Sequence, residues 1–364
     1  MGQAGSLVVW FALAVLPASA APVADQPALP PATIHQIGRI VTARMLGAKI
    51  PGLTVAVGVR TRRAWAQGFG TADLENSVAA TPETVYRIGS ISKPITAVAV
   101  MQLAERSKLD LDAPVQKYVP SFPAKPWPIT TRELLAHLSG IRHYRSEEEV
   151  DSTRHYTNLL DPLRVFAGEP LLFEPGTSYS YSTYGYDLLG AVVESVSGMR
   201  FLDYLRANVF APAGMEHTGE DNVYRIVPHR AHGYRRNLDG GIENCALVDT
   251  SNKIPGGGLL STAGDLIRFA GALERGDLVK LATRDRMFAP QRTRDGRPVP
   301  YGLGWAVVDL DGKRWTLHPG IQQGASACLL VSPANGLSVV ILANLEAVDL
   351  EPLAVRIAEI LLAP

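Results

Sequence analysis

The 364-residue chain contains only two cysteines, Cys245 and Cys328. Two thiols are too few for a disulfide scaffold or a Cys-based zinc site. The chain also lacks an excess of either charge, because 35 Lys and Arg residues balance 35 Asp and Glu residues. A balanced charge argues against nucleic acid or an anionic membrane surface as the main partner. Whether the two cysteines pair stays open, because their separation in space does not follow from the sequence.

Motifs of several other enzyme classes are missing. No Gly-x-Ser-x-Gly occurs, which argues against an α/β-hydrolase. Gly68-Phe69-Gly70 lacks the third glycine of a dinucleotide loop, and the glycine run at 256–258 has no following Lys-Ser/Thr, as a P-loop requires. His-Glu-x-x-His is absent too, so we expect no metal and no organic cofactor. We interpret the following histidines as core or loop residues: His137, His143, His155, His229 and His232.

The N-terminus has a continuous apolar run over residues 7–16, broken by Pro17 and followed by Ala18-Ser19-Ala20. This pattern predicts a signal peptide over 1–20, cleaved after Ala20, and a secreted or periplasmic protein. The run is short for a bilayer span, so no stable membrane anchor is expected. An uncleaved anchor is the alternative, because no Lys or Arg precedes Arg39. Residues 21–33 are rich in Ala and Pro and predict a flexible segment.

Strand patterns lie at both ends of the remaining chain. They are predicted at 53–59, 64–69, 304–310, 314–318, 325–331 and 337–342. Helices are predicted at 34–46, 96–103, 186–195 and 353–362; the second is apolar on every side, which is typical of a buried helix. Thr262 with Asp265 predicts a capping box. The simplest packing is an α+β fold in which one antiparallel sheet is built from both terminal parts and flanked by helices, beside a mostly helical subdomain. We expect one domain over 34–364, with its α/β part at about 34–110 and 300–364 and its helical part at about 110–300.

Ser90 and Lys93 lie three residues apart at the start of the predicted buried helix. Residues at this spacing lie on the same face, so the lysine amine can reach the serine hydroxyl. Burial favours the neutral amine, which can take the proton that makes serine a nucleophile. The helix N-terminus adds free backbone N–H groups that can stabilise an oxyanion. By itself Ser-x-x-Lys is a common pattern, and a helix-start serine beside a solvated lysine is the alternative.

Two later segments favour the catalytic interpretation. Tyr181 heads a Tyr-Ser-Thr triplet before a helix, and a tyrosine beside a lysine and a serine can pass a proton to a leaving group. His318-Pro319-Gly320 ends a predicted strand, where a glycine lets backbone N–H groups approach a substrate carbonyl. Three neighbouring tyrosines at helical spacing are expected to be packing residues: Tyr179, Tyr184 and Tyr186.

With these motifs in this order, the chain resembles the serine β-lactamase and penicillin-binding-protein superfamily, on the side of class C β-lactamases, family VIII esterases and the D-peptidases of peptidase family S12. Within it, the chain is most similar to LACTB-type serine hydrolases. The segments that carry this resemblance are 82–93, 109–120, 137–144, 181–186 and 256–266. The resemblance implies a β-lactamase/transpeptidase-like fold.

The resemblance also implies roles for individual residues. Ser90 is the nucleophile that is acylated, and Lys93 and Tyr181 handle the proton. The backbone N–H groups of Ser90 and Ile321 form the oxyanion hole. Residues that bind substrate are Thr183, His318, Pro319 and Gly320.

The chain departs from the β-lactamase pattern at three of these positions. Thr183 stands where β-lactamases carry Asn, His318 where they carry Lys, and Pro319 where they carry Thr or Ser. A mostly neutral imidazole anchors a substrate carboxylate less firmly than an ammonium. We therefore expect weak β-lactam hydrolysis, and we expect His318 to gain charge near its ordinary pKa of about 6.5.

The sequence predicts an exported serine hydrolase that acts on small esters, β-lactams, or D-amino-acid or short peptide amides. The alternative is a scaffold or penicillin-binding protein on the same fold with little or no catalysis. Because LACTB-type members assemble into filaments, the resemblance leaves self-association open.

Overall fold

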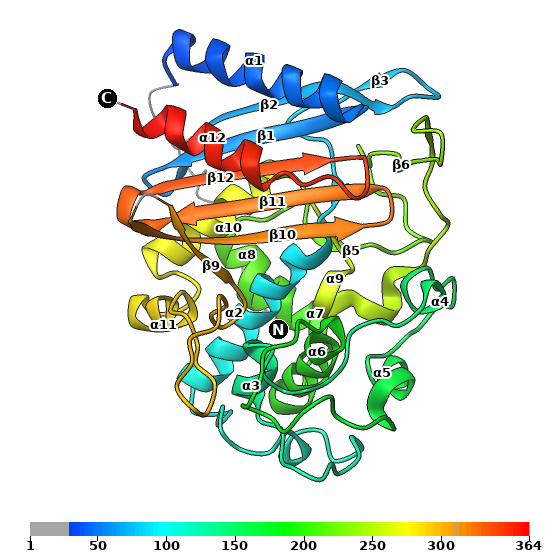
Figure 1. The fold of residues 1–364 in the computed structure, drawn as a ribbon, viewed down its shortest axis with the longest axis vertical. Helices are drawn as coiled ribbons and strands as arrows, with labels where there is room; N and C mark the ends of the chain where they lie inside the picture. Colours follow the sequence, from blue (N-terminus) through cyan, green and yellow to red (C-terminus); the bar gives the residue numbers. More distant parts are fainter. Residues whose placement is uncertain (1–28, 311, 364) are drawn as a thin grey trace, which may run out of the picture.

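An antiparallel sheet of seven strands carries both ends of the part of the chain that the structure describes (Figure 1). The structure, a computed structural model, describes residues 29–310 and 312–363. The signal peptide predicted at 1–20 lies outside these ranges. The strand order is β3-β2-β1-β12-β11-β10-β9, so pairing of β1 with β12 joins the two ends. The strands are β1 (Gly52–Val59), β2 (Arg62–Asp73), β3 (Val78–Ala79), β9 (Ala306–Leu310), β10 (Lys313–Gln322), β11 (Ala325–Ser332) and β12 (Leu337–Ala343).

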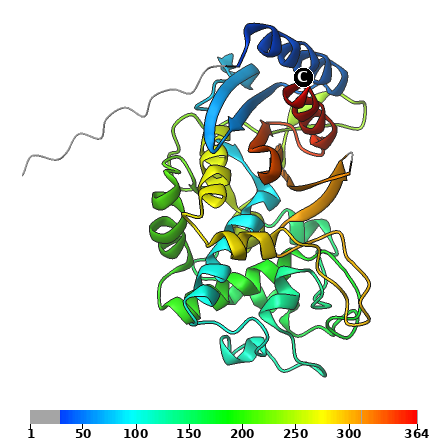
Figure 2. The same ribbon diagram turned by 90° about the vertical axis from the view of Figure 1, so that its left-hand side faces the viewer.

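Helices cover both faces of this sheet. On one face α1 (Pro31–Ala48) and α12 (Glu351–Leu362) lie side by side (Figures 1 and 2). The other face packs against α10 (Ala263–Arg275), with α2 (Ser92–Glu105) beyond it. Because apolar layers lie on both sides, β11 and β12 are buried along their whole length instead of alternating between core and solvent.

The α2 helix runs through the mostly helical part, which lies on one side of the sheet (Figure 1). Residues 92–103 are all buried; the apolar pattern predicted a buried helix at 96–103, and α2 begins four residues earlier, at Ser92. The first turn of α2 therefore lies between the sheet and the helical part. The other helices are α3 (Thr131–Leu135), α4 (Glu147–Val150), α5 (Leu160–Ala167), α6 (Thr183–Ser197), α7 (Phe201–Leu205), α8 (Ala211–Ala213), α9 (Ile254–Gly257) and α11 (Leu281–Met287). Among the described residues, no helix combines the length and the apolar character that a bilayer crossing requires.

Two small sheets complete the described fold. One contains β4 (Tyr86–Arg87), β8 (Leu259–Ser261) and β5 (Gly219–Glu220); the other pairs β6 (Tyr234–Arg236) with β7 (Ile242–Asn244). Both cysteines are free thiols. Cys328 is buried on β11 in the core beneath α1 and α12, whereas Cys245 follows β7 and lies against Gly233 and Gly324. The two thiols therefore occupy different parts of the fold.

The predicted α+β fold is confirmed, with three local differences. α1 begins at Pro31, so residues 31–33 of the predicted flexible segment are its first turn; proline suits this position because its missing N–H needs no partner there. β10 continues beyond His318 to Gln322. Thr262 accepts a hydrogen bond from the backbone N–H of Asp265, but the Asp265 carboxylate accepts from His217 and Thr218 instead of returning to the cap. Thr262 is therefore an N-cap residue, but the reciprocal hydrogen bond of a capping box, from the N-cap backbone N–H to the side chain three residues later, is missing.

A substitution at Gly304, just before β9, tests how closely this end of the sheet packs against α2. Its φ is +94°, and a Cβ there would lie 2.4 Å from the Cβ of Ala97. We predict that Gly304→Ala lowers the free energy of unfolding by about 2–4 kcal/mol, because backbone strain adds to overpacking. Gly296→Ala is the matched control, since Gly296 has a φ of +88° and open space around it. The control should lose only the backbone part, about 1–2 kcal/mol. Urea unfolding measures both losses, and equal values would contradict the packing argument.

Candidate active site

Ser90 lies in a single 3₁₀ turn, η1 (Gly89–Ile91), directly before α2. β4 leads into this turn and is held by its pairing with β8. Gly89 has a φ of +50°, and a Cβ there would lie 2.8 Å from the backbone nitrogen of Ile321 on β10. Glycine permits both the positive φ and this close approach. The turn that carries Ser90 therefore packs directly on the edge of β10.

Lys93 is fully buried on the first turn of α2. Its Nζ lies 2.9 Å from Ser90 Oγ, 3.1 Å from Thr183 Oγ1 and 2.6 Å from the carbonyl oxygen of Gly256. Burial is the main cause that lowers the pKa of Lys93 to about 7. A large share of Lys93 is therefore unprotonated near neutral pH, and its lone pair can accept the Ser90 proton.

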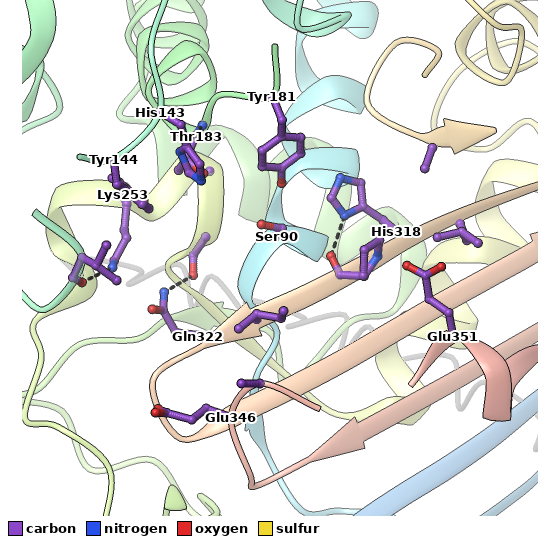
Figure 3. A pocket seen from close by; sticks show the side chains of 18 of the residues that line it. Ser90, His143, Tyr144, Tyr181, Thr183, Lys253, His318, Gln322, Glu346 and Glu351 are labelled. Atoms are coloured by element: carbon purple, nitrogen blue, oxygen red, sulfur yellow. Dashed lines mark hydrogen bonds between the residues drawn. The ribbon is translucent and has the colours of Figure 1, made fainter. Parts of the chain in front are cut away.

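Tyr181 lies over the same two groups, two residues before α6. Its hydroxyl lies near enough to Ser90 for Ser90 to act on the Tyr181 pKa, and Lys93 Nζ lies 4.8 Å from its ring centroid. Figure 3 shows the two hydroxyls pointing toward each other. Burial raises the pKa of Tyr181 above its ordinary value, so the phenol keeps its proton at neutral pH. The structure thus brings together the three residues that the motifs predicted as catalytic.

Histidines and tyrosines pack around Tyr181. The His137 ring lies 4.3 Å from the Tyr181 ring, and His137 Nδ1 accepts a hydrogen bond from the backbone N–H of Ser182. Burial lowers the pKa of His137 well below its ordinary value, so this core histidine is neutral. Tyr186 is buried and donates to the carbonyl oxygen of Leu135. His137 therefore packs against the Tyr181 ring, and Tyr186 is a buried packing residue, as expected.

The hydroxyl of Thr183 is occupied by Lys93. Thr183 is the first residue of α6, is only 3% exposed, and lies at the wall of the cavity. Its backbone N–H donates to Nδ1 of His143 at 3.3 Å. Thr183 therefore holds the lysine in place, and direct binding of substrate by Thr183 stays a prediction.

The structure contradicts the expectation that His318 gains charge near pH 6.5. His318 is 1% exposed, its Nδ1 lies 2.7 Å from the carbonyl oxygen of Pro319, and its Nε2 lies 2.8 Å from the hydroxyl of Tyr301. A carbonyl oxygen only accepts, so Nδ1 carries the proton and Nε2 accepts from Tyr301. Burial, aided by the charge of Lys93, lowers the pKa of His318 to about 3. Both ring nitrogens are engaged, so a substrate carboxylate would have to displace Tyr301 to reach Nε2.

Pro319 and Gly320 lie inside β10 and not after its end. β9 pairs with β10 only as far as Leu317, so the following residues form an open edge on that side. Proline is tolerated on such an edge because no neighbouring strand needs its N–H. A Cβ at Gly320 would lie 2.1 Å from the carbonyl oxygen of Ile88, so glycine is required there. The two residues shape the strand edge against which the Ser90 turn packs.

A cavity of about 740 Å³ opens at Ser90. Ile321 on its wall is 60% exposed, and Gln322 donates to the carbonyl oxygen of Gly257 at 2.9 Å. Figure 3 shows Glu346 and Glu351 at the β10 side of the cavity and Lys253 across from them. Both the volume and the mixture of aromatic, aliphatic and polar walls suit a small organic substrate. Its apolar walls include Tyr179, Val308, Leu317 and Ile321.

Sequence reasoning missed two buried charged residues at this site. Lys253 is 2% exposed and donates to the carbonyl oxygen of Val150 at 2.6 Å; Asp187 is 3% exposed on α6. The sequence signal was present, because Lys253 directly precedes the run Ile-Pro-Gly-Gly-Gly and Asp187 interrupts an apolar helix. Charged residues in segments that must be buried are rare without a function or a partner.

The chain is similar to known proteins in sequence and in fold. The family model described as "Beta-lactamase" matches residues 37–362. The human protein "Serine beta-lactamase-like protein LACTB, mitochondrial" is 32% identical over 85% of this chain and 76% of its own length. The octameric penicillin-binding protein homologue from Pyrococcus abyssi has a TM-score of 0.80 at 24% identity, over 90% of this chain and 77% of that one. EstCE1, a hydrolase with promiscuous acyltransferase activity, has a TM-score of 0.76 at 25% identity, over 89% and 98%.

We predict that His318 stays neutral from pH 8 down to pH 5. Its folded pKa lies below the ordinary 6.5, so its neutral form persists through this window, and stability is lost only as acid charges the histidine in the unfolded chain. Imidazole ¹⁵N shifts measure this directly and should report a proton on Nδ1 throughout. Tyr301→Phe is the control, because it removes the donor to Nε2 and should move that signal alone. A titration midpoint above pH 5.5 for His318 would show that the assignment is wrong.

Proposed function

Because this chain belongs to the Beta-lactamase family, we propose that it is a serine hydrolase that forms a covalent acyl-enzyme at Ser90. The observation that carries the proposal is the 2.9 Å contact between Ser90 Oγ and the buried amine of Lys93. A serine hydroxyl is a weak nucleophile until a base accepts its proton. A lysine whose pKa is about 7 supplies that base at neutral pH.

Acylation follows from the positions of three groups. Ser90 Oγ attacks the substrate carbonyl carbon while Lys93 Nζ accepts the hydroxyl proton. The carbonyl oxygen becomes an oxyanion, which the backbone N–H groups of Ser90 and Ile321 stabilise. Tyr181 then gives its hydroxyl proton to the leaving oxygen or nitrogen as the bond to the carbonyl carbon breaks, and the proton held by Lys93 replaces it on Tyr181. Water attacks the ester carbonyl of acyl-Ser90 in the second half, which releases the acid and restores the serine hydroxyl.

The walls of the cavity favour substrates without a carboxylate anchor. His318 offers neither a charge nor a free ring nitrogen, and Pro319 offers no hydroxyl. We therefore place small esters and short or D-amino-acid amides ahead of β-lactams. The likeness to EstCE1, a hydrolase, supports acyl-transfer chemistry on this scaffold.

A purely structural role is the rival function, with self-association as its basis. The octameric homologue from Pyrococcus abyssi supports self-association on this fold. A scaffold has no use for a fully buried amine beside a serine hydroxyl, because desolvating an amine costs several kcal/mol. We therefore treat self-association as a property that can accompany catalysis. Size-exclusion chromatography beside the labelling experiment below separates the two.

We predict that a fluorophosphonate probe forms a covalent adduct at Ser90 and that Ser90→Ala removes it. The reason is that the probe reacts with serines activated by a neighbouring base. Intact-mass spectrometry and peptide mapping measure the adduct. Ser180→Ala is the matched control, since it removes a half-buried hydroxyl next to Tyr181 and should keep full labelling. Equal adduct on the Ser90→Ala protein would refute the assignment of the nucleophile.

We also predict that kcat/KM for p-nitrophenyl butyrate exceeds kcat/KM for benzylpenicillin at pH 7.5. A missing charge-assisted hydrogen bond of roughly 1.5–3 kcal/mol costs a carboxylate-bearing substrate about one to two orders of magnitude, and the ester is spared. Because His318 remains neutral, lowering the pH to 6 should leave the ratio of the two constants unchanged. Faster hydrolysis of benzylpenicillin, or a ratio that falls sharply at pH 6, would contradict this account of specificity.

A further inference from the structure

Asp187 is a buried carboxyl that the proposed mechanism does not use. It lies on α6, one turn after Thr183, and is 3% exposed. Neither of its oxygens accepts a hydrogen bond of ordinary geometry from the described residues, although the backbone N–H of Gly256 lies near enough to favour the ionised form. A buried carboxyl left this way costs free energy unless a neighbouring charge offsets it.

Asp187 and Lys93 share two neighbouring residues. A Cβ at Gly256 would lie 3.1 Å from Asp187 Oδ1, and the carbonyl oxygen of the same Gly256 accepts from Lys93 Nζ. Thr183, which also accepts from Lys93, shares a helix face with Asp187 because the two are four residues apart. The carboxyl therefore lies next to the two residues whose oxygens hold the amine.

Lys253 brings a second amine to the same place. It is 2% exposed, lies at the cavity wall, and its Nζ is 5.4 Å from the ring centroid of Tyr144. Its one hydrogen bond among the described residues is to the carbonyl oxygen of Val150. Two buried amines and one buried carboxyl thus lie within electrostatic range of one another: Asp187 and Lys253 act on Lys93, and both amines act on Asp187. Lys253 is itself influenced by Asp187, Asp151 and Arg87.

We propose that Asp187 and Lys253 are positioning residues with opposite effects on Lys93: the carboxylate of Asp187 strengthens the hold of Lys93 on a proton, and the ammonium of Lys253 weakens it. The inference rests on the proposed function, in which Lys93 is the base. The balance allows the amine to be neutral when it takes the Ser90 proton and stabilised once it carries that proton.

The direction of each shift supports this balance. Burial lowers the pKa of Lys253 to about 8 and raises the pKa of Asp187 to about 8. The pKa of Lys93 is about 7, so all three groups titrate in the same range and a proton gained by one is felt by the others. The Asp187 charge raises the pKa of Lys93, and the Lys253 charge lowers it.

Other titratable groups also face Lys93. Histidines come from the segment after α3 and from β10, and tyrosines come from that segment and from the start of α6. The histidines have lowered pKa values and the tyrosines raised ones, so all of them are neutral near pH 7. The groups are His137, His143, His318, Tyr144, Tyr181 and Tyr186. Asp187 and Lys253, whose pKa values are both about 8, are therefore the neighbours that change charge in the range of Lys93, and their replacement should move its titration.

The test compares Asp187→Asn, Lys253→Met and the double variant. Titration of the ¹³Cε resonance of Lys93, assigned by its loss in Lys93→Met, reads the amine whether or not a substrate is known. We expect Asp187→Asn to lower the Lys93 midpoint and Lys253→Met to raise it, each by about one pH unit, with the double variant near the wild type. The acid limb of kcat/KM for p-nitrophenyl acetate should move in the same directions. Asp203→Asn and Lys117→Met are the controls, because both residues are exposed and should leave the midpoint unchanged.

The outcomes separate this inference from the proposed function. An unchanged Lys93 midpoint in Asp187→Asn, or shifts of both variants in one direction, would overturn the inference. If Asp187→Asn does not fold, Lys253→Met remains a test, and a midpoint that fails to rise would overturn the role of Lys253. Opposite shifts in a protein that labels at no serine and hydrolyses no substrate would support the inference about proton affinity and refute the proposed function.

Discussion

The buried amine of Lys93 is the interaction on which the site depends. With no exposed surface, the amine has to find its hydrogen-bond partners in the protein, and it finds them in η1, α6 and α9. These three contacts hold the Ser90 turn, the start of α6 and the glycine run at 256–258 at fixed distances from one another. The same burial lowers the pKa of Lys93, so the constraint that assembles the site also prepares its base.

A second constraint is the close approach of the Ser90 turn to β10. Gly89 and Gly320 both lie where a side chain would collide with backbone on the other element. Ile321 follows on β10, with its backbone against the turn, which is the arrangement an oxyanion hole requires. Because β10 pairs with β9 over residues 313–317 and with β11 over residues 316–322, its second half has one open edge, so one strand both anchors the sheet and forms the wall of the cavity.

The polar groups around this wall explain why the roles of the β-lactamase motif residues cannot all be assigned to the matching residues of this chain. His318 occupies the position of a cationic residue, yet its ring is sealed between Tyr301 and its own strand. The charges that remain near Lys93 are those of Asp187 and Lys253, on the helical side of the site. Charge on the helical side therefore acts on the proton of the base, whereas the His318 ring itself stays neutral.

Some of this follows from the sequence alone. The apolar run after Lys93 predicts a helix buried on all sides, the β-branched segments predict the strands, and the three-residue spacing of Ser90 and Lys93 places one side chain in reach of the other, because all of these are local properties of the chain. The partners of Lys93 at Thr183 and Gly256 lie 90 and 163 residues away, so tertiary structure alone decides that they meet. The neutral state of His318 and the encounter of Asp187 with Lys253 are decided there as well, since a pKa depends on burial and on charges from distant segments, which local sequence does not encode.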